Sequence, residues 1–189
     1  MTKIGLQGAK GSFSEEAAGI FAKNHGIEQF QFEYLISSKY VLKSLESNEI
    51  NFGIIAMENA QGGVVIESVK ALANHKCDII EMFHLQIGQT LLVKPGIHLG
   101  QITEIHSHQQ ALRQCKDYLS EHFWTRPLVE TDDTAEAARR LSEGKLPNTV
   151  GVIGSKFCSE LYSLTILEKN IHDLKNNLTL FLGLTNFGN

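Results

Sequence analysis

The 189-residue chain is 42% hydrophobic and 20% charged, an ordinary globular composition with enough apolar material for a core. Its net charge of −4 argues against nucleic acid as the main partner, and charges interrupt every apolar run before it reaches membrane-spanning length. The first residues lack an apolar stretch of signal-peptide length, so we expect a cytoplasmic protein.

Strand and helix patterns alternate through the first part of the chain. The first helix begins at Ser12, with Glu15 three residues later as in a capping box, and ends at Gly26. A serine also precedes the second helix. The predicted strands are 3–8, 29–36 and 52–58, and the predicted helices are 12–26, 38–49 and 62–76.

The middle of the chain departs from this rhythm. Residues 77–96 carry two strand patterns without a helix between them, which indicates passage into a second lobe. The alternation then resumes, and it predicts α/β layers with parallel strand pairing. The later predicted strands are 102–106, 126–131, 149–154, 164–169 and 177–184, and the later predicted helices are 107–123, 132–145 and 155–163.

Glycine, carboxylate and amide residues follow two of the early strands. "GLQGAKGSFS" brings glycines, including Gly11, to a helix start, where backbone N–H groups bind anions; a tight turn with a cap at Ser12 or Ser14 explains it equally well. In "MENAQGG", Glu58 and Asn59 follow a buried strand, where ligand-binding groups collect, although ordinary turn chemistry is the alternative.

Two later helix starts carry polar residues as well. In "SHQQALRQC", Ser107 and Gln110 fit a capping box. Gln114 lies one turn further along the same face and has no such structural explanation. In "DDTAEAA", Asp133 or Thr134 caps the next helix, which is a sufficient role.

The stretch "NNLTLF" reads as a strand in which Thr179 faces away from a row of leucines. The leucine face is expected in a core, so the open question is what Thr179 contacts. The leucines are Leu178, Leu180, Leu182 and Leu184.

Metal and nucleophile chemistry find little support. His106 and His108 form an HxH pair, but no nearby cysteine or carboxylate set completes a metal site. No GxSxG motif is present. The three cysteines lack CxxC spacing and read as reduced core residues: Cys77, Cys115 and Cys158.

Five segments together resemble one family in order and spacing. "GSFSEEAA", "MENAQGGVV", "SHQQALRQC", "DDTAEAA" and "NNLTLF" are similar to the motifs of prephenate dehydratases and the related arogenate dehydratases. The resemblance extends from Ile4 to about Leu184 and implies a periplasmic-binding-protein-like (type II) fold of two α/β lobes with a cleft between them. We expect lobe 1 over about 1–80 plus 165–189 and lobe 2 over about 81–164.

The resemblance also implies a reaction: prephenate loses carbon dioxide and its ring hydroxyl to give phenylpyruvate, without a metal or organic cofactor. Thr179 matches the family's functional threonine and is expected to act on the leaving oxygen. Asn59 and Gln114 are expected to orient the substrate, and backbone N–H groups of the glycine turns to bind carboxylate. The substrate-binding residues expected are Ser12, Asn59, Ser107, Gln114, Gly11 and Glu58.

Leu180 replaces the arginine that follows the family's threonine. Strand alternation places position 180 on the face opposite Thr179, so a core leucine is tolerable unless a bulge intervenes. Lys10, Arg113 and Lys156 are the candidate substitute cations.

We expect a prephenate dehydratase without the regulatory ACT domain that many family members carry, assembled as a homodimer or homotetramer. Two alternatives stay open. One is a relative that acts otherwise on prephenate or arogenate, for example by decarboxylation alone. The other is a two-lobed small-molecule binding protein that has lost turnover.

Overall fold

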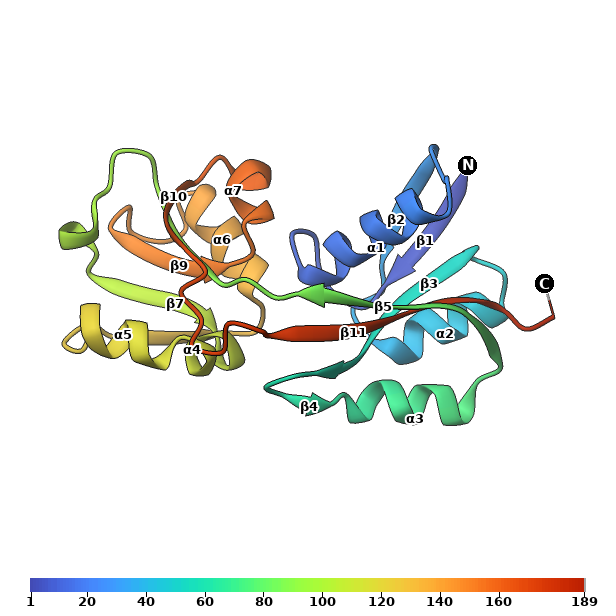
Figure 1. The fold of residues 1–189 in the computed structure, drawn as a ribbon. Coiled ribbons are helices and arrows are strands. Elements are labelled where there is room, and N and C mark those ends of the chain that lie inside the picture. Colours follow the sequence, from blue (N-terminus) through green and yellow to red (C-terminus); the bar gives the residue numbers. More distant parts are fainter. Residues whose placement is uncertain (189) are drawn as a thin grey trace. The chain divides into compact units, whose positions relative to one another are not determined.

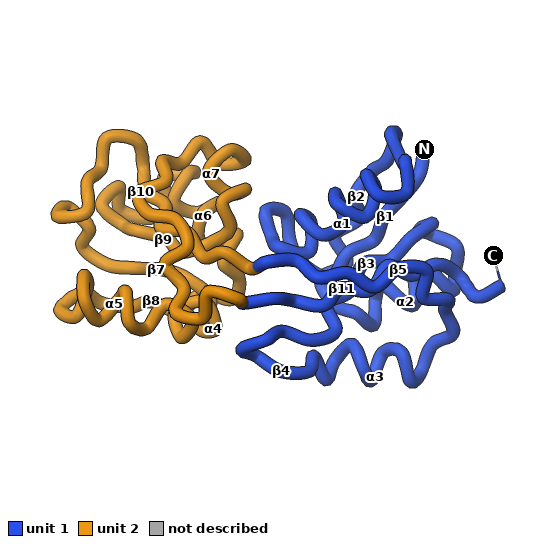
Figure 2. Tube along the Cα trace, in the orientation of Figure 1, with its two compact units in different colours: residues 1–86, 177–189 blue, residues 87–176 orange. Residues whose placement is uncertain are grey.

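The computed structural model describes residues 1–188 and divides the chain into two compact units (Figure 2). Unit 1 is Met1–Gln86 with Asn177–Asn189, and unit 2 is Ile87–Asn176. Relative to the lobe boundaries expected from sequence, residues 81–86 lie in unit 1 and 165–176 in unit 2. The reason is strand pairing, because residues 81–86 pair with the last strand and 165–169 pair inside unit 2.

Unit 1 is built on a mixed sheet in the order β2-β1-β3-β11-β5, with β4 paired to β3 (Figure 1). β1 is parallel to β2 and β3, whereas β11 is antiparallel to both β3 and β5, so the expected parallel pairing holds for only part of the sheet. The strands are β1 (Thr2–Leu6), β2 (Phe30–Tyr34), β3 (Phe52–Asn59), β4 (Gly63–Val64), β5 (Cys77–Gln86) and β11 (Leu178–Asn186), and the helices are α1 (Phe13–Asn24), α2 (Ser38–Glu46) and α3 (Ile66–Asn74).

Helices cover both faces of this sheet, with α1 on one side and α2 and α3 on the other (Figure 1). On the α1 side, Phe21 lies so close to Gly183 that an added Cβ would come within 2.4 Å of its ring, so β11 requires glycine there. On the other side, Leu182 and Leu184 pack in one buried cluster with Val41, Leu42, Leu45, Ile50, Ile55 and Ala71. The end of the leucine row differs from expectation, since Leu178 is 39% exposed and Leu180 only half-buried.

Unit 2 contains the second sheet, in the order β10-β6-β9-β7-β8. β7 is parallel to β8 and β9, while β6 is antiparallel to β9 and β10. The elements are β6 (Thr90–Val93), η1 (Leu99–Gln101), β7 (Glu104–His108), α4 (Gln109–Gln114), α5 (Lys116–His122), β8 (Leu128–Thr131), α6 (Thr134–Ser142), β9 (Val150–Gly154), α7 (Phe157–Tyr162) and β10 (Thr165–Lys169).

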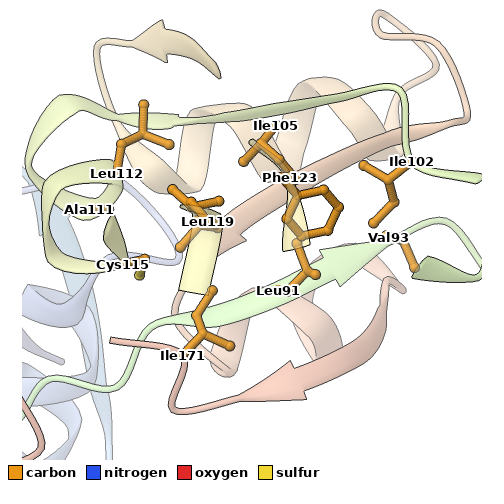
Figure 3. Close-up of a cluster of buried hydrophobic side chains, with 11 residues drawn as sticks. Leu91, Val93, Ile102, Ile105, Ala111, Leu112, Cys115, Leu119, Phe123 and Ile171 are labelled. Carbon is orange, nitrogen blue, oxygen red and sulfur yellow. The ribbon is translucent and has the colours of Figure 1, made fainter. Parts of the chain in front are cut away.

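Two buried clusters hold unit 2 together. One lies beneath α4 and α5, where Leu112, Leu119 and Phe123 belong to one cluster with the strand residues Leu91 and Ile105 (Figure 3). The other joins α6 to the sheet through Leu92, Ala135, Ala137, Ala138, Leu141, Val150, Val152, Cys158 and Leu164.

The predicted helix over 107–123 is interrupted at Cys115, which separates α4 from α5. Asp173 explains the break. Its N–H donates to the carbonyl oxygen of Gln114 at 2.7 Å, and its carboxylate accepts the N–H of Asp117 at 3.2 Å. The helical ladder is therefore replaced at this point by bonds to a distant segment, which local sequence does not reveal.

Helix capping agrees with the sequence in two places. The Ser37 hydroxyl accepts the N–H of Tyr40 at the start of α2, and the Asp133 carboxylate accepts that of Ala135 at 2.6 Å at the start of α6. The Ser107 cap was wrong, because Ser107 lies within β7 and His108 caps α4 instead. The Ser12 capping box was also wrong, since Ser12 occupies the cap position without a side-chain bond.

None of the three cysteines is in a disulfide within residues 1–188. Burial raises the pKa of the Cys115 thiol to about 12, so it remains protonated and unreactive. Within residues 1–188, no helix is long and apolar enough to cross a bilayer.

Candidate functional site

A hydroxyl and an amide meet where β11 runs beside β3 in unit 1. Thr179 is paired with Asn59 in the antiparallel register, and Asn59 Nδ2 donates to Thr179 Oγ1 at 2.8 Å. Thr179 is 6% exposed. The residues come from distant parts of the chain, so only the folded sheet brings them together.

The Asn59 amide is fixed in orientation by its backbone neighbours. Its Oδ1 accepts the N–H groups of Gln61 at 3.1 Å and Gly62 at 2.8 Å, and its Nδ2 also donates to Asn177 Oδ1 at 2.9 Å. The oxygen therefore faces the turn, and the nitrogen faces Thr179 and Asn177. This turn bonding is the structural role that the sequence left open for Asn59, and it also aims the amide.

The bond from Asn59 fixes which part of the Thr179 hydroxyl accepts a hydrogen bond and which part donates one. Its oxygen accepts from Asn59, so its own O–H hydrogen points elsewhere, and no acceptor for it occurs in residues 1–188. Asn177 is fully buried, and its Nδ2 also lacks a partner in this part of the chain. The cluster of Thr179, Asn59 and Asn177, here called the threonine–amide cluster, thus keeps two unused donors.

Sequence reasoning did not select Asn177 as a site residue. It stands two positions before Thr179 within "NNLTLF", and the family motif begins at this asparagine. Its place in this motif is the sequence feature that could have identified Asn177 as a site residue.

The glycine turn at the start of α1 differs from the expected anion site. The Gly11 N–H donates to Glu15 Oε2 at 2.6 Å, and the Tyr34 hydroxyl donates to Glu15 Oε1 at 3.0 Å. Glu15 is buried, so the protein's own carboxylate lies where an external anion was expected. The Ser12 hydroxyl lies close to Gly8, and its oxygen is buried without a partner within residues 1–188.

Glu58 occupies the other face of the sheet. It pairs with Leu180 in the register, whereas Asn59 pairs with Thr179, and opposed residues of antiparallel strands share a face. The Glu58 side chain is exposed. The structure therefore does not bring Glu58 together with the threonine–amide cluster.

The remaining expected site residues lie in unit 2. Ser107 is fully buried, and its hydroxyl donates to the Ile153 carbonyl at 2.7 Å, which ties β7 to β9. Gln114 is also buried, and its Oε1 accepts from Gln89 Nε2 at 2.9 Å. Gln114 thus has a structural partner that its sequence did not indicate.

His172 extends this buried polar group. Its Nδ1 accepts the N–H of Gln89 at 3.3 Å, which requires a neutral ring nitrogen. Burial lowers the pKa of His172, and the neighbouring Lys175 ammonium lowers it further. The imidazole is therefore an acceptor at neutral pH.

No group of three or more His, Cys, Asp or Glu side chains able to hold a metal ion occurs in residues 1–188. Hydroxyl and amide groups instead make up the threonine–amide cluster and the Gln89–Gln114 pair. Such groups hydrogen-bond oxygen-rich molecules without carrying charge of their own.

Two units, each a sheet covered by helices, define an α/β protein. The sequence model of the family described as prephenate dehydratase matches residues 4–188, and the chain belongs to this family. The resemblance stated from the five motifs is thereby confirmed.

Curated relatives agree. The chain is 33% identical over 174 residues to "Prephenate dehydratase" from Methanocaldococcus jannaschii, covering 92% of this chain and 61% of that protein. It is 33% identical over 182 residues to "Arogenate dehydratase/prephenate dehydratase 1, chloroplastic" from Arabidopsis thaliana, covering 95% and 44%. The chain thus spans between two-fifths and two-thirds of the length of these relatives.

The fold matches a solved member of the family. The structure of prephenate dehydratase in complex with L-Phe from Arthrobacter aurescens superposes with a TM-score of 0.88 at 23% identity, covering 100% of this chain and 61% of that one. The expected α/β fold class is therefore confirmed.

Proposed function

We propose that this chain catalyses the decarboxylating dehydration of prephenate to phenylpyruvate in phenylalanine biosynthesis. Family membership supports the reaction class, and the threonine–amide cluster supports the assignment of its catalytic residue. The carrying observation is the 2.8 Å bond from Asn59 Nδ2 to Thr179 Oγ1.

The reaction breaks two bonds of the substrate. The bond between the ring and its carboxylate breaks to release carbon dioxide, and the electron pair enters the ring. The ring C–O bond then breaks, and the departing hydroxide takes a proton to become water. Aromatisation supplies the driving force, so the enzyme's task is to place the leaving oxygen and stabilise its developing charge.

Thr179 is suited to that oxygen. Because Asn59 donates to Oγ1, the threonine O–H is directed away from Asn59 and is available as a donor. A threonine hydroxyl is a weak acid, so its contribution is a hydrogen bond to the departing oxygen or relay of a proton. A positioned proton donor contributes about 10²–10⁴-fold to such a step.

Asn59 positions Thr179, and Asn177 adds the second unused donor of the cluster. Ser12, Ser107 and Gln114 stay predicted substrate-binding residues on the family resemblance. Glu58 lies on the opposite face from Thr179, and the Gly11 N–H is bonded to Glu15, so neither carries the proposal.

The test compares two threonines of the same strand. Thr179→Val removes the hydroxyl at nearly constant volume, and we expect phenylpyruvate formation, followed by ultraviolet absorbance, to fall about 10²-fold or more. Thr179→Ser keeps the hydroxyl and should retain most of the rate.

Thr185→Val is the matched control. Thr185 is also buried on β11, but its hydroxyl donates to the Asn51 carbonyl at 3.4 Å, away from Asn59. It should keep wild-type kcat/KM. Circular dichroism and urea unfolding confirm that each variant is folded. Wild-type turnover in the folded Thr179→Val variant would refute the role of Thr179.

Absence of turnover in the wild-type protein would refute the proposed activity itself. If prephenate then bound without reacting, the alternative of a small-molecule binding protein would stand; release of carbon dioxide with retention of the hydroxyl would indicate a decarboxylase. Comparing prephenate with arogenate identifies the preferred substrate. Assembly as a cytoplasmic homodimer or homotetramer stays a prediction that light scattering tests.

A further inference from the structure

A pocket of about 530 Å³ in unit 2 has no part in the proposed reaction. Of the residues that the sequence suggested for the substrate site, only Arg113, one of the three candidate substitute cations, lines it. We call it the α4–β8 pocket; its lining is Gln109, Leu112, Arg113, Lys116, Leu119, Ser120, Phe123, Trp124, Arg126, Leu128 and Glu130.

The floor of the pocket is apolar and buried. Leu112, Leu119 and Phe123 belong to the buried cluster beneath α4 and α5 (Figure 3). At the rim, Trp124 is 81% exposed and Leu128 47%. The Trp124 indole is exposed to water beside this apolar floor. A flat apolar ligand that covered the indole would bury apolar surface, which lowers the free energy of the complex.

The walls of the same pocket are cationic. Arg113, Lys116 and Arg126 are exposed, and within residues 1–188 none of them forms an ion pair. The pocket thus gathers three cations at one place in a chain whose net charge is −4.

One carboxylate limits the charge that the pocket accepts. Glu130 lines it and accepts a hydrogen bond from Gln109 Nε2 at 3.2 Å. A polyphosphate would be repelled by this group, whereas a single carboxylate pairs with a guanidinium through two parallel N–H···O bonds. A neutral apolar molecule would leave the cations without a partner.

We propose that the α4–β8 pocket binds a small aromatic carboxylate, with its ring against Trp124 and Phe123 and its carboxylate among Arg113, Lys116 and Arg126. The volume falls in the range of about 300–1,000 Å³ typical of small-molecule sites. The proposal concerns a second site and does not depend on the dehydratase activity.

Trp124 provides the readout because it is the chain's single tryptophan. Hydrocinnamate titrated into the full chain should change the intrinsic fluorescence saturably and shift the emission to shorter wavelength, as the exposed indole is covered. Hydrocinnamyl alcohol, which has the same ring without the charge, and hexanoate, which has the charge without the ring, should each bind at least about tenfold more weakly.

The double variant R113Q/R126Q should weaken hydrocinnamate binding by about tenfold or more. The control K39Q/K70Q removes the same charge from two exposed lysines of unit 1 and should bind as wild type. Calorimetry with Trp124→Leu should show weakened binding independently of fluorescence. All four positions substituted for charge are exposed, so these variants are expected to fold, and circular dichroism verifies it.

Several outcomes would overturn the proposal. Equal affinity for hydrocinnamyl alcohol would show that the cations do not contribute to binding. Equal affinity for hexanoate would show that the aromatic ring of the ligand does not contribute. Tighter binding of adenosine monophosphate would replace the carboxylate by a phosphate ligand. An unsaturable response, or one unchanged in R113Q/R126Q, would mean that the pocket is not the binding site.

Discussion

Leu180 is the residue at which the chain departs most clearly from its family motif, and the strand geometry limits the effect. A register shift does occur between Leu180 and Phe181, but the extra residue is Met57 on β3. β11 itself pairs with β5 residue for residue from Leu178 to Gly183. The alternation along β11 is therefore intact, and Leu180 faces away from Thr179 as predicted.

We expect Leu180→Arg to change kcat/KM for prephenate by less than about threefold, because the guanidinium would lie opposite the exposed Glu58 rather than beside Thr179. A cross-strand ion pair of this kind contributes about 0.2–1 kcal/mol, so urea unfolding should show little change. Steady-state kinetics check the expectation. A tenfold or greater fall in KM would show instead that the present site lacks a cation that the substrate needs.

At this scale the sequence predicted the residues better than their partners. Thr179 and Asn59 were both selected, and they form one hydrogen-bonded pair. The Glu15 carboxylate on the Gly11 N–H and the Gln89 amide on Gln114 were not foreseen. The spacing of Ser12 and Glu15 predicted a capping box instead of the Glu15–Gly11 bond. The Gln89–Gln114 bond joins residues 25 positions apart, beyond any local sequence pattern.

Elements with local signals were predicted closely, and elements set by distant contacts were not. The Ser37 and Asp133 caps were found because they depend on residues within one turn. The break between α4 and α5 depends on Asp173, and the antiparallel course of β11 depends on which strands it joins. The hydrophobic periodicity of the sequence predicts neither the helix break nor the direction of β11.

The segment that carries His172 gives unit 2 a dependence on pH. The folded-state pKa of His172 lies below its ordinary value of 6.5, first through burial and then through Lys175. As pH falls below that ordinary value, the unfolded chain takes up the proton before the folded one does, so stability is lost. Above it, this contribution is fully present.

We therefore expect the free energy of unfolding of the wild-type protein to fall more between about pH 8 and about pH 5.5 than that of His172→Gln. Glutamine keeps an acceptor for the Gln89 N–H but does not titrate. Urea unfolding at several pH values measures the difference. Parallel pH profiles for the two proteins would contradict the assignment, and His122→Gln, at an exposed histidine of α5, serves as the control.

At the scale of the molecule, the two units differ in how the chain builds them. Unit 2 is one continuous segment, Ile87–Asn176, with both of its own buried clusters. Unit 1 is assembled from both ends of the chain, and β11 lies inside its sheet, between β3 and β5. The sequence indicated the two-unit organisation, but the boundaries followed from strand partners.

Expressed alone, residues 87–176 should fold cooperatively, because all five strands of the second sheet lie in this segment. Residues 1–86 alone should not, since without β11 the strand β5 has no partner. Circular dichroism with urea unfolding distinguishes a cooperative transition from a gradual one. Adding a peptide of residues 177–189 should restore structure to 1–86, and a cooperative transition of 1–86 by itself would contradict the expectation.

The position of β11 also sets an order of events during synthesis. The ribosome releases every residue of unit 2 before it releases the strand that closes the first sheet. Unit 2 can therefore mature while the first part of unit 1 waits, with one edge of β3 unpaired until β11 has been synthesised. Chaperone demand should then fall mainly on residues 1–86, and Thr179 can meet Asn59 only after all of unit 2 has been synthesised.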